Sequence, residues 1–160
     1  MNVHNPYSPP EAKVSDLGPL TDGSPVSSER LYTHQQIAVA AFLGSFLAAG
    51  WFFGKNFAAL GQPEKKTPAL ALGLAAALAV GVIGYFLPDR VPNVVTGLAC
   101  FFAARVYAEQ KFGKAVTAHL AAGGQRGSWW VVVGVSLLFA LAIVAVFLAV
   151  FLIFFRENLP

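Results

Sequence analysis

Long apolar stretches alternate with short polar ones along this chain. Residues 31–54, 67–88, 91–104 and 127–155 contain no charged side chain. A helix of about 20 apolar residues crosses the hydrocarbon core of a bilayer. The pattern predicts an all-α, polytopic transmembrane helix bundle with four spans. We expect helices at about 33–54, 68–87, 92–108 extending towards 122, and 128–155, within one transmembrane helical domain over 31–160.

The third segment allows two interpretations. Residues 91–104 are fewer than the roughly 17 that a span requires, so a re-entrant or interfacial helix fits them as well. A full span is favoured because the Arg105 side chain can extend to the interface while Val106, Tyr107 and Ala108 continue the apolar stretch. Three spans plus one re-entrant or interfacial helix is therefore the alternative fold.

The ends of these segments carry recognisable signals. Thr33 and Gln36 have the spacing of a capping box, which predicts a helix start. Aromatic and basic side chains near the ends of spans are typical of membrane interfaces. The predicted interfacial anchors are Trp51, Tyr85, Arg105, Trp129, Trp130 and Arg156.

Small residues recur at helical spacing on the first two predicted helices. The residues predicted to pack helices together are Gly44, Gly50, Gly54, Ala69, Gly73, Ala77 and Gly81. Such positions let two backbones approach closely, and packing drives helix association in lipid. The stripe on the second helix serves either a dimer interface or packing inside one bundle. The second interpretation is favoured because four helices supply their own partners.

Residues 1–30 have a different composition. They contain Pro6, Pro9, Pro10, Pro19 and Pro25 with few large apolar side chains, so they cannot bury enough surface to offset ordering. We expect a disordered, proline-rich tail. No apolar stretch with a cleavage site appears here, so we expect no cleaved signal peptide.

The distribution of basic residues makes the orientation depend on the number of spans. The chain is 56% hydrophobic and 12% charged, with a net charge of +3. With four spans, most basic residues lie in 55–67 and 105–128, which puts both loops in the cytoplasm and both termini outside. With three spans the N-terminus is cytoplasmic. Basic residues that flank spans are explained by topology, so no nucleic-acid partner is expected.

Acidic, histidine and cysteine side chains, which carry out most enzyme chemistry, are few in this chain. All acidic residues fall in tails, loops or helix ends, which argues against a proton-coupled transporter. His4, His34 and His119 have no metal-ligand spacing, and the lone Cys100 lies in an apolar segment. No nucleotide-binding or hydrolase motif is present. We expect no enzyme activity, no cofactor, no metal and no catalytic residue.

Short motifs suggest a family. The start Asn5-Pro6-Tyr7-Ser8-Pro9-Pro10-Glu11-Ala12, the run Gln36-Ile37-Ala38 through Phe42-Leu43-Gly44, and the later Lys55-Asn56-Phe57, Leu60-Gly61, Gly123-Gly124 and Ser128-Trp129 carry the resemblance. The chain resembles a family of small bacterial, proteobacterial-type four-helix integral membrane proteins with an NPYxPPxA-like N-terminal tail. The resemblance implies a multi-pass protein of the bacterial inner membrane, and it implies no activity.

Two functions of different classes follow. The first is a non-enzymatic membrane protein that acts through a membrane or cytoplasmic protein partner, as an accessory, assembly or immunity-type protein. The second is a small oligomeric channel or facilitator for a neutral solute or ion, in which small-residue stripes pack several copies together. Both place the chain in the lipid bilayer, and a homo-oligomer is compatible with either.

Overall fold

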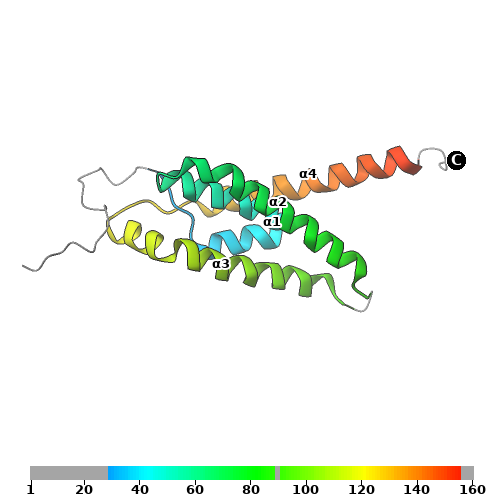
Figure 1. Cartoon of the computed structure of the whole chain (residues 1–160), viewed down its shortest axis with the longest axis horizontal. Coiled ribbons are helices and arrows are strands. Elements are labelled where there is room, and N and C mark those ends of the chain that lie inside the picture. The colour runs from blue at the N-terminus through cyan, green and yellow to red at the C-terminus, as the bar shows by residue number, and fades with distance from the viewer. Residues whose placement is uncertain (1–28, 89–90, 156–160) are drawn as a thin grey trace, which may run out of the picture.

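A computed structural model describes residues 29–88 and 91–155 of this chain. They form α1 (His34–Ala59), the short 3₁₀ helix η1 (Pro63–Lys65), α2 (Lys66–Phe86), α3 (Asn93–Ala121) and α4 (Trp129–Phe155) (Figure 1). No β-strand occurs in these two ranges. The predicted all-α class is confirmed. Residues 1–28 of the predicted tail, the Asp89–Arg90 pair and Arg156 lie outside the described residues.

Three of the helical segments are long and apolar enough to cross a membrane: α1, η1 together with α2, and α4. The chain is therefore a helical membrane protein by the character of its helices. The α3 helix is not one of the three, and the charged residues Arg105 and Glu109 lie in its middle. The doubtful third segment of the sequence is thus a long helix that lacks a uniformly apolar stretch.

The α1 helix is broken in its middle, and the chain reverses there. Gly44 and Ser45 have non-helical backbone angles, and Ser45 has φ 68° and ψ 175°. The Tyr32 N–H donates to Asn56 Oδ1 at 2.8 Å, although the two residues are 24 positions apart. A straight helix would separate them by about 36 Å. The sequence predicts one continuous first helix, whereas the structure has a hairpin of two helical arms, 34–43 and 46–59 (Figure 1).

Local chemistry explains where the hairpin turns. A Cβ atom on Gly44 would lie 2.5 Å from the carbonyl oxygen of Ser136 in α4, so only glycine fits at the tip. Ser45 adopts a positive φ that costs a non-glycine residue about 1–3 kcal/mol. Its Oγ accepts a hydrogen bond from the Leu47 N–H at 3.3 Å, which caps the second arm. The first arm begins at the predicted capping box of Thr33 and Gln36.

The hairpin lies at the centre of the molecule. The α2, α3 and α4 helices each pack on α1, and no two of these three share more than a marginal contact. On α2, Gly73 faces Gly50 so closely that a Cβ on either residue would lie 2.9 Å from the other's Cα. The α1 hairpin is therefore what holds the three longer helices together.

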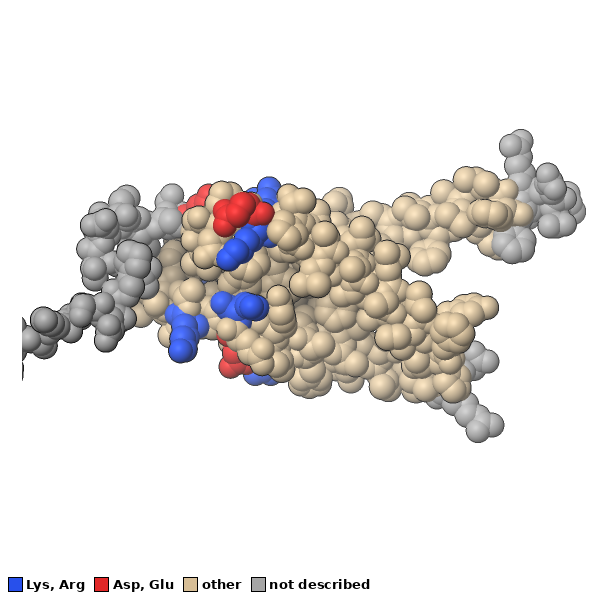
Figure 2. Space-filling view, viewed as in Figure 1, with Lys and Arg blue, Asp and Glu red and all other residues tan. Residues whose placement is uncertain are grey.

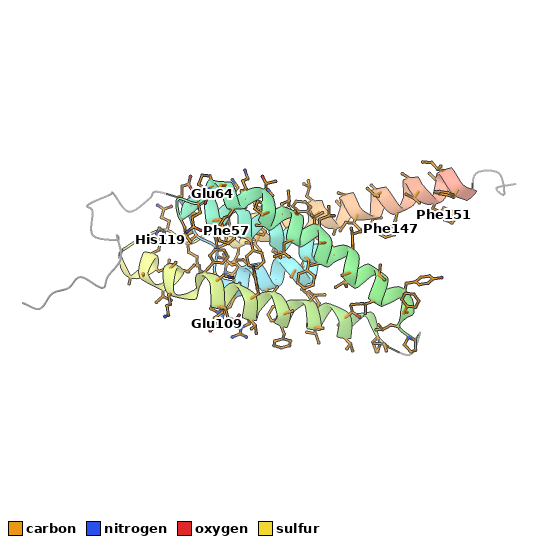
Figure 3. The ribbon with its side chains drawn as sticks, viewed as in Figure 1. Phe57, Glu64, Glu109, His119, Phe147 and Phe151 are labelled. Carbon is orange, nitrogen blue, oxygen red and sulfur yellow. The ribbon has the colours of Figure 1, made fainter. Side chains whose placement is uncertain are left out.

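Aromatic rings join the hairpin to α3. Phe53 and Phe57 of the second arm pack on Phe112, with ring centroids 5.7 and 4.8 Å apart, and Phe53 also contacts Tyr107. Figure 3 shows Phe57 inside the bundle, whereas Phe147 and Phe151 lie on the part of α4 that extends beyond the α1 hairpin. The buried core is thus concentrated at one end of the molecule, around the hairpin.

The close contact at the hairpin tip generates a stability prediction. Substituting Gly44→Ala places a methyl group against Ser136 and Ala48, and we expect it to lower the free energy of unfolding by about 1–3 kcal/mol. Thermal unfolding of the protein in mild detergent measures the effect. The matched control is Gly134→Ala in α4, where an added Cβ meets no atom within 4 Å. Equal melting temperatures for the two variants would contradict the close packing at the tip.

Candidate functional site

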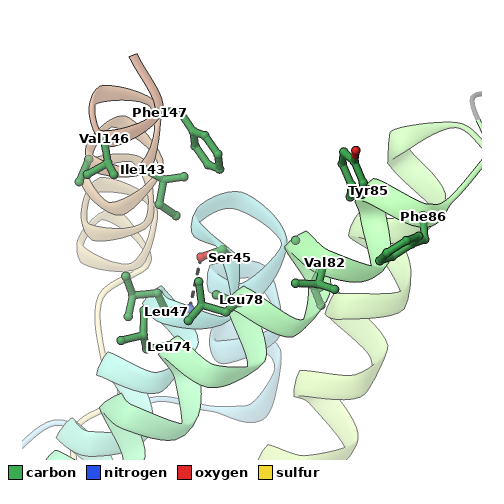
Figure 4. Close-up of a pocket in the computed structure, with 14 residues that line it drawn as sticks. Ser45, Leu47, Leu74, Leu78, Val82, Tyr85, Phe86, Ile143, Val146 and Phe147 are labelled. Carbon is green, nitrogen blue, oxygen red and sulfur yellow. Dashed lines mark hydrogen bonds between the residues drawn. The ribbon is translucent and has the colours of Figure 1, made fainter. Parts of the chain in front are cut away.

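Beyond the hairpin tip, α2 and α4 continue without α1 between them. A cavity of about 910 Å³ opens there, with Ser45 and Leu47 of the tip at its base and the far halves of α2 and α4 as its walls (Figure 4). On α2 the lining runs from Leu74 to Phe86, which is about 18 Å along the helix axis. That length is close to one leaflet of a hydrocarbon core about 30 Å thick. We call this cavity the α2–α4 groove.

The α2–α4 groove is lined almost entirely by hydrocarbon. Ser45 and Tyr85 are its two lining residues with a polar side chain. The Ser45 hydroxyl is already engaged with the Leu47 N–H, and Tyr85 is 86% exposed at the end of α2. A lining of this kind has no pair of groups for acid–base or nucleophilic chemistry. It favours an apolar occupant such as a transmembrane helix or an acyl chain.

The small-residue stripe of α2 is divided by the hairpin tip. Ala69 and Gly73 pack against Gly50 of α1, whereas Ala77 and Gly81 line the α2–α4 groove. A Cβ atom on Gly81 would meet nothing within 4 Å. One half of the stripe therefore packs within the chain, and the other half faces open space.

The remaining predicted packing and anchor residues are spread over both ends of the molecule. Gly54 lies against Lys66 at the start of α2. The Lys55 ammonium lies over the Trp51 ring, 5.3 Å from its centroid. Trp129 and Trp130 begin α4, and Trp130 is 86% exposed. Arg105 is half-buried on α3.

Charged side chains gather at the end of the bundle opposite the α2–α4 groove. Figure 2 shows them over the region of η1, the end of α1 and the second half of α3, while the far part of the visible face carries none. The exposed lysines of these elements and of the start of α2 are Lys55, Lys65, Lys66, Lys111 and Lys114, and the exposed Glu64 and Glu109 belong to the same elements. This surface, which we call the basic end, has the composition of a bundle end in water.

The basic end contains a second, polar cavity. It measures about 680 Å³ and is lined by the start of α1 and by α3, including His34, Glu109 and Lys114. His119 lies near it on α3, with Nε2 buried and without a hydrogen-bond partner among the described residues. No group of three His, Cys, Asp or Glu side chains comes together in the described ranges.

Two buried amides join distant segments at the basic end. Asn56 Nδ2 donates to the Tyr32 carbonyl at 2.8 Å, which completes a two-bond pairing with the Tyr32 backbone. Gln36 Nε2 donates to the carbonyl of Gly127, which ties the first arm to the start of α4. Burial raises the pKa of the Tyr32 phenol despite the opposing effect of the nearby Arg30 charge.

Comparison with protein-family models, with curated proteins and with solved structures finds no match to this chain. The family resemblance drawn from the N-terminal motif therefore stays a prediction.

Sequence reasoning missed the groove because it missed the reversal in α1. The available signal was the Gly44-Ser45 pair in the middle of an apolar helix, since such pairs are common sites of sharp kinks. A second signal was the polar pair Gln36 and Asn56, which a transmembrane helix exposes to lipid only at a cost.

The amide pairing at the hairpin base can be tested directly. Substituting Asn56→Ala leaves the buried N–H and carbonyl of Tyr32 without these partners, and we expect a loss of about 1–3 kcal/mol for each group in the free energy of unfolding. Thermal unfolding in detergent again serves as the measurement. Gln110→Ala, at an exposed position of α3, is the control. A shift no larger than the control's would show that the reversal is held by other contacts.

Proposed function

We propose that this chain is a multi-pass protein of the bacterial inner membrane that crosses the bilayer three times. The arms of α1, 34–43 and 46–59, are about 15 and 21 Å long, which is too short for a core of about 30 Å. On this proposal α1 enters and leaves the membrane on one side, and α2, α3 and α4 are the crossings. The α3 helix is the least apolar of the three, and it crosses because it connects the far end of α2 to the start of α4 at the basic end. The re-entrant element is then the first helix, whereas the sequence analysis gave a re-entrant third segment only as the alternative to four spans.

The distribution of basic residues supports an orientation. With a re-entrant α1, the N-terminal tail, the loop at Gly61 and the connector at Gln125 share the side of the basic end. That side carries most of the chain's 11 Lys and Arg residues, while Arg90 and Arg156 follow the far ends of α2 and α4 in the sequence. The positive-inside rule then places the N-terminus and the basic end in the cytoplasm.

The number of crossings can be decided by cysteine labelling from outside the cell. In a Cys100→Ser background, we expect cysteines at Ser15, Gly61 and Gln125 to resist a membrane-impermeant maleimide, and a cysteine at Pro160 to react. The position that decides is Ser15, because the other three have the same sidedness whether or not α1 crosses. Labelling of Ser15 in intact cells, with Gly61 still protected, would mean that α1 crosses as one span.

We further propose that the protein is non-enzymatic and acts by binding a transmembrane helix of a protein partner in the α2–α4 groove. The observation that carries this proposal is the division of the α2 stripe. Gly73 packs closely against the backbone of α1. The same stripe of small residues continues into the groove at Ala77 and Gly81. A second helix in the far leaflet would pack on α2 as the hairpin arm does in the near leaflet.

The chemistry of the groove supports a helix as occupant in a further way. Its walls are apolar, so an entering helix leaves no polar group unsatisfied in the membrane. The length of the groove, about one leaflet, matches the part of α2 that the hairpin leaves uncovered. An accessory, assembly or immunity-type role is compatible with contacts of this kind.

A photo-crosslinking amino acid at Gly81 tests this proposal, with Gly84 as the matched control. Both positions lie on α2 in open space, but only Gly81 lines the groove. In native membranes we expect a polypeptide adduct from position 81 and several-fold less from position 84, measured by gel mobility and mass spectrometry. Adducts of position 81 with lipid alone would show that the groove holds bilayer lipid and would remove the proposal.

A further inference from the structure

We infer that a small crevice between α2 and α3, in the leaflet next to the basic end, binds an anionic phospholipid. One acyl chain lies in the crevice, and the headgroup phosphate is held at Lys111. The crevice shares no lining residue with the α2–α4 groove, so the inference goes beyond the proposed function. It takes from that proposal only the placing of α2 and α3 across the membrane.

The crevice, which we call the α2–α3 crevice, has an apolar lining and a volume of about 310 Å³. Its floor is the second arm of the hairpin, at Phe46 and Phe53. Its walls are formed by Leu72, Gly73 and Ala76 of α2 and by Ala103, Ala104 and Tyr107 of α3. Tyr107 is the one lining residue with a polar side chain, so the interior of the crevice suits hydrocarbon.

The height of the crevice decides between an acyl chain and a helix. On each wall the lining covers about 6 Å along the helix axis, from Leu72 to Ala76 and from Ala103 to Tyr107. A helix is about 10 Å wide with its side chains, and one that packed along α2 and α3 would contact several turns of both walls. A single acyl chain is narrower and needs no such length. The crevice therefore fits a lipid chain and excludes a partner helix.

Two polar groups lie at the end of the crevice nearest the basic end. The exposed Lys111 is one turn beyond Tyr107 on α3, and its ammonium lies 5.9 Å from the centroid of the Tyr107 ring. The Tyr107 hydroxyl makes no hydrogen bond to any described residue. From Ala103 to Lys111 the helix rises about 12 Å, which is less than one leaflet of about 15 Å. A chain in the crevice thus brings its headgroup to the level of the lysine.

Charge selects the kind of headgroup. Within the described part of the chain Lys111 forms no ion pair, and Glu109 lines the polar cavity between α3 and the start of α1. A second exposed lysine, Lys65 of η1, lies 5.8 Å from the ring centroid of Phe57, which belongs to the same aromatic cluster as Phe53 at the floor. Both sides of the crevice therefore bring a cation to its mouth, where a headgroup with net negative charge is the complementary ligand.

Native mass spectrometry of the full-length chain in mild detergent tests the inference, with equal amounts of dioleoyl phosphatidylglycerol and dioleoyl phosphatidylcholine added. We expect several-fold more phosphatidylglycerol to stay bound, and Lys111→Gln should reduce its retention several-fold. The matched control is Lys55→Gln, because Lys55 is also an exposed lysine over an aromatic ring, but its partner Trp51 does not line the crevice. Equal retention of the two lipids, retention of neither, or equal effects of the two substitutions would overturn the inference.

A second pair of variants tests whether the acyl chain occupies the crevice. Ala103 is an exposed lining residue, so Ala103→Phe fills the crevice while the chain still folds, and we expect several-fold less bound phosphatidylglycerol. Ala71→Phe is the control, because Ala71 is exposed on α2 and lines neither the crevice nor the α2–α4 groove. Retention that survives Ala103→Phe would mean that lysines bind the headgroup without the crevice, and it would contradict the inference.

These measurements are independent of the helix partner proposed for the α2–α4 groove. Photo-adducts at Gly81 report on that groove, whereas lipid retention and its loss in Lys111→Gln report on the α2–α3 crevice. Failure of either proposal therefore leaves the other standing.

Discussion

The reversal of α1 at Gly44 and Ser45 is the feature on which the rest of the structure depends. Two contacts hold it: the tip lies against the Ser136 backbone, and the Asn56 amide pairs with the Tyr32 backbone at the base. Ser45 adopts a backbone conformation that costs about 1–3 kcal/mol, and the surrounding contacts offset this cost. Without the reversal, α2, α3 and α4 would have no common surface on which to pack.

A short central hairpin has a direct physical consequence. It fills one end of the bundle, where its aromatic rings pack on α3, Gly50 packs on α2 and the Gln36 amide binds the segment before α4. Its arms are shorter than a bilayer core, so at the other end the long helices continue without it. The α2–α4 groove is therefore a result of the difference in length between the hairpin and its neighbours. Its apolar lining follows because the far halves of α2 and α4 carry almost only apolar side chains.

The two ends of the molecule also differ in chemistry, because the hairpin reaches only one of them. The amide groups of Gln36 and Asn56 are buried at the basic end, where each finds a backbone partner. The far end has no comparable network in the described ranges, and there the walls of the groove are side chains of Leu, Val, Ile, Phe and Ala. On the proposed function, binding at the far end depends on shape and close packing, since directional bonds are scarce there.

The sequence by itself determined that the helices lie in lipid and that the secondary structure is α-helical. Uncharged stretches of sufficient length predict helices in lipid, and the Thr33–Gln36 capping box marks where the first one begins. These features are local, so each is readable from neighbouring residues. The sequence also revealed the small-residue stripe of α2. It did not reveal which half of that stripe packs inside the chain.

Only the tertiary structure decided that the first apolar segment turns back on itself. Periodicity and hydropathy are the same for a straight 26-residue helix and for two short arms joined by a turn. The choice depends on contacts between residues far apart in sequence, such as Tyr32 with Asn56 and Gly44 with Ser136. The groove depends on the same long-range contacts, because it forms only beyond the tip of the hairpin.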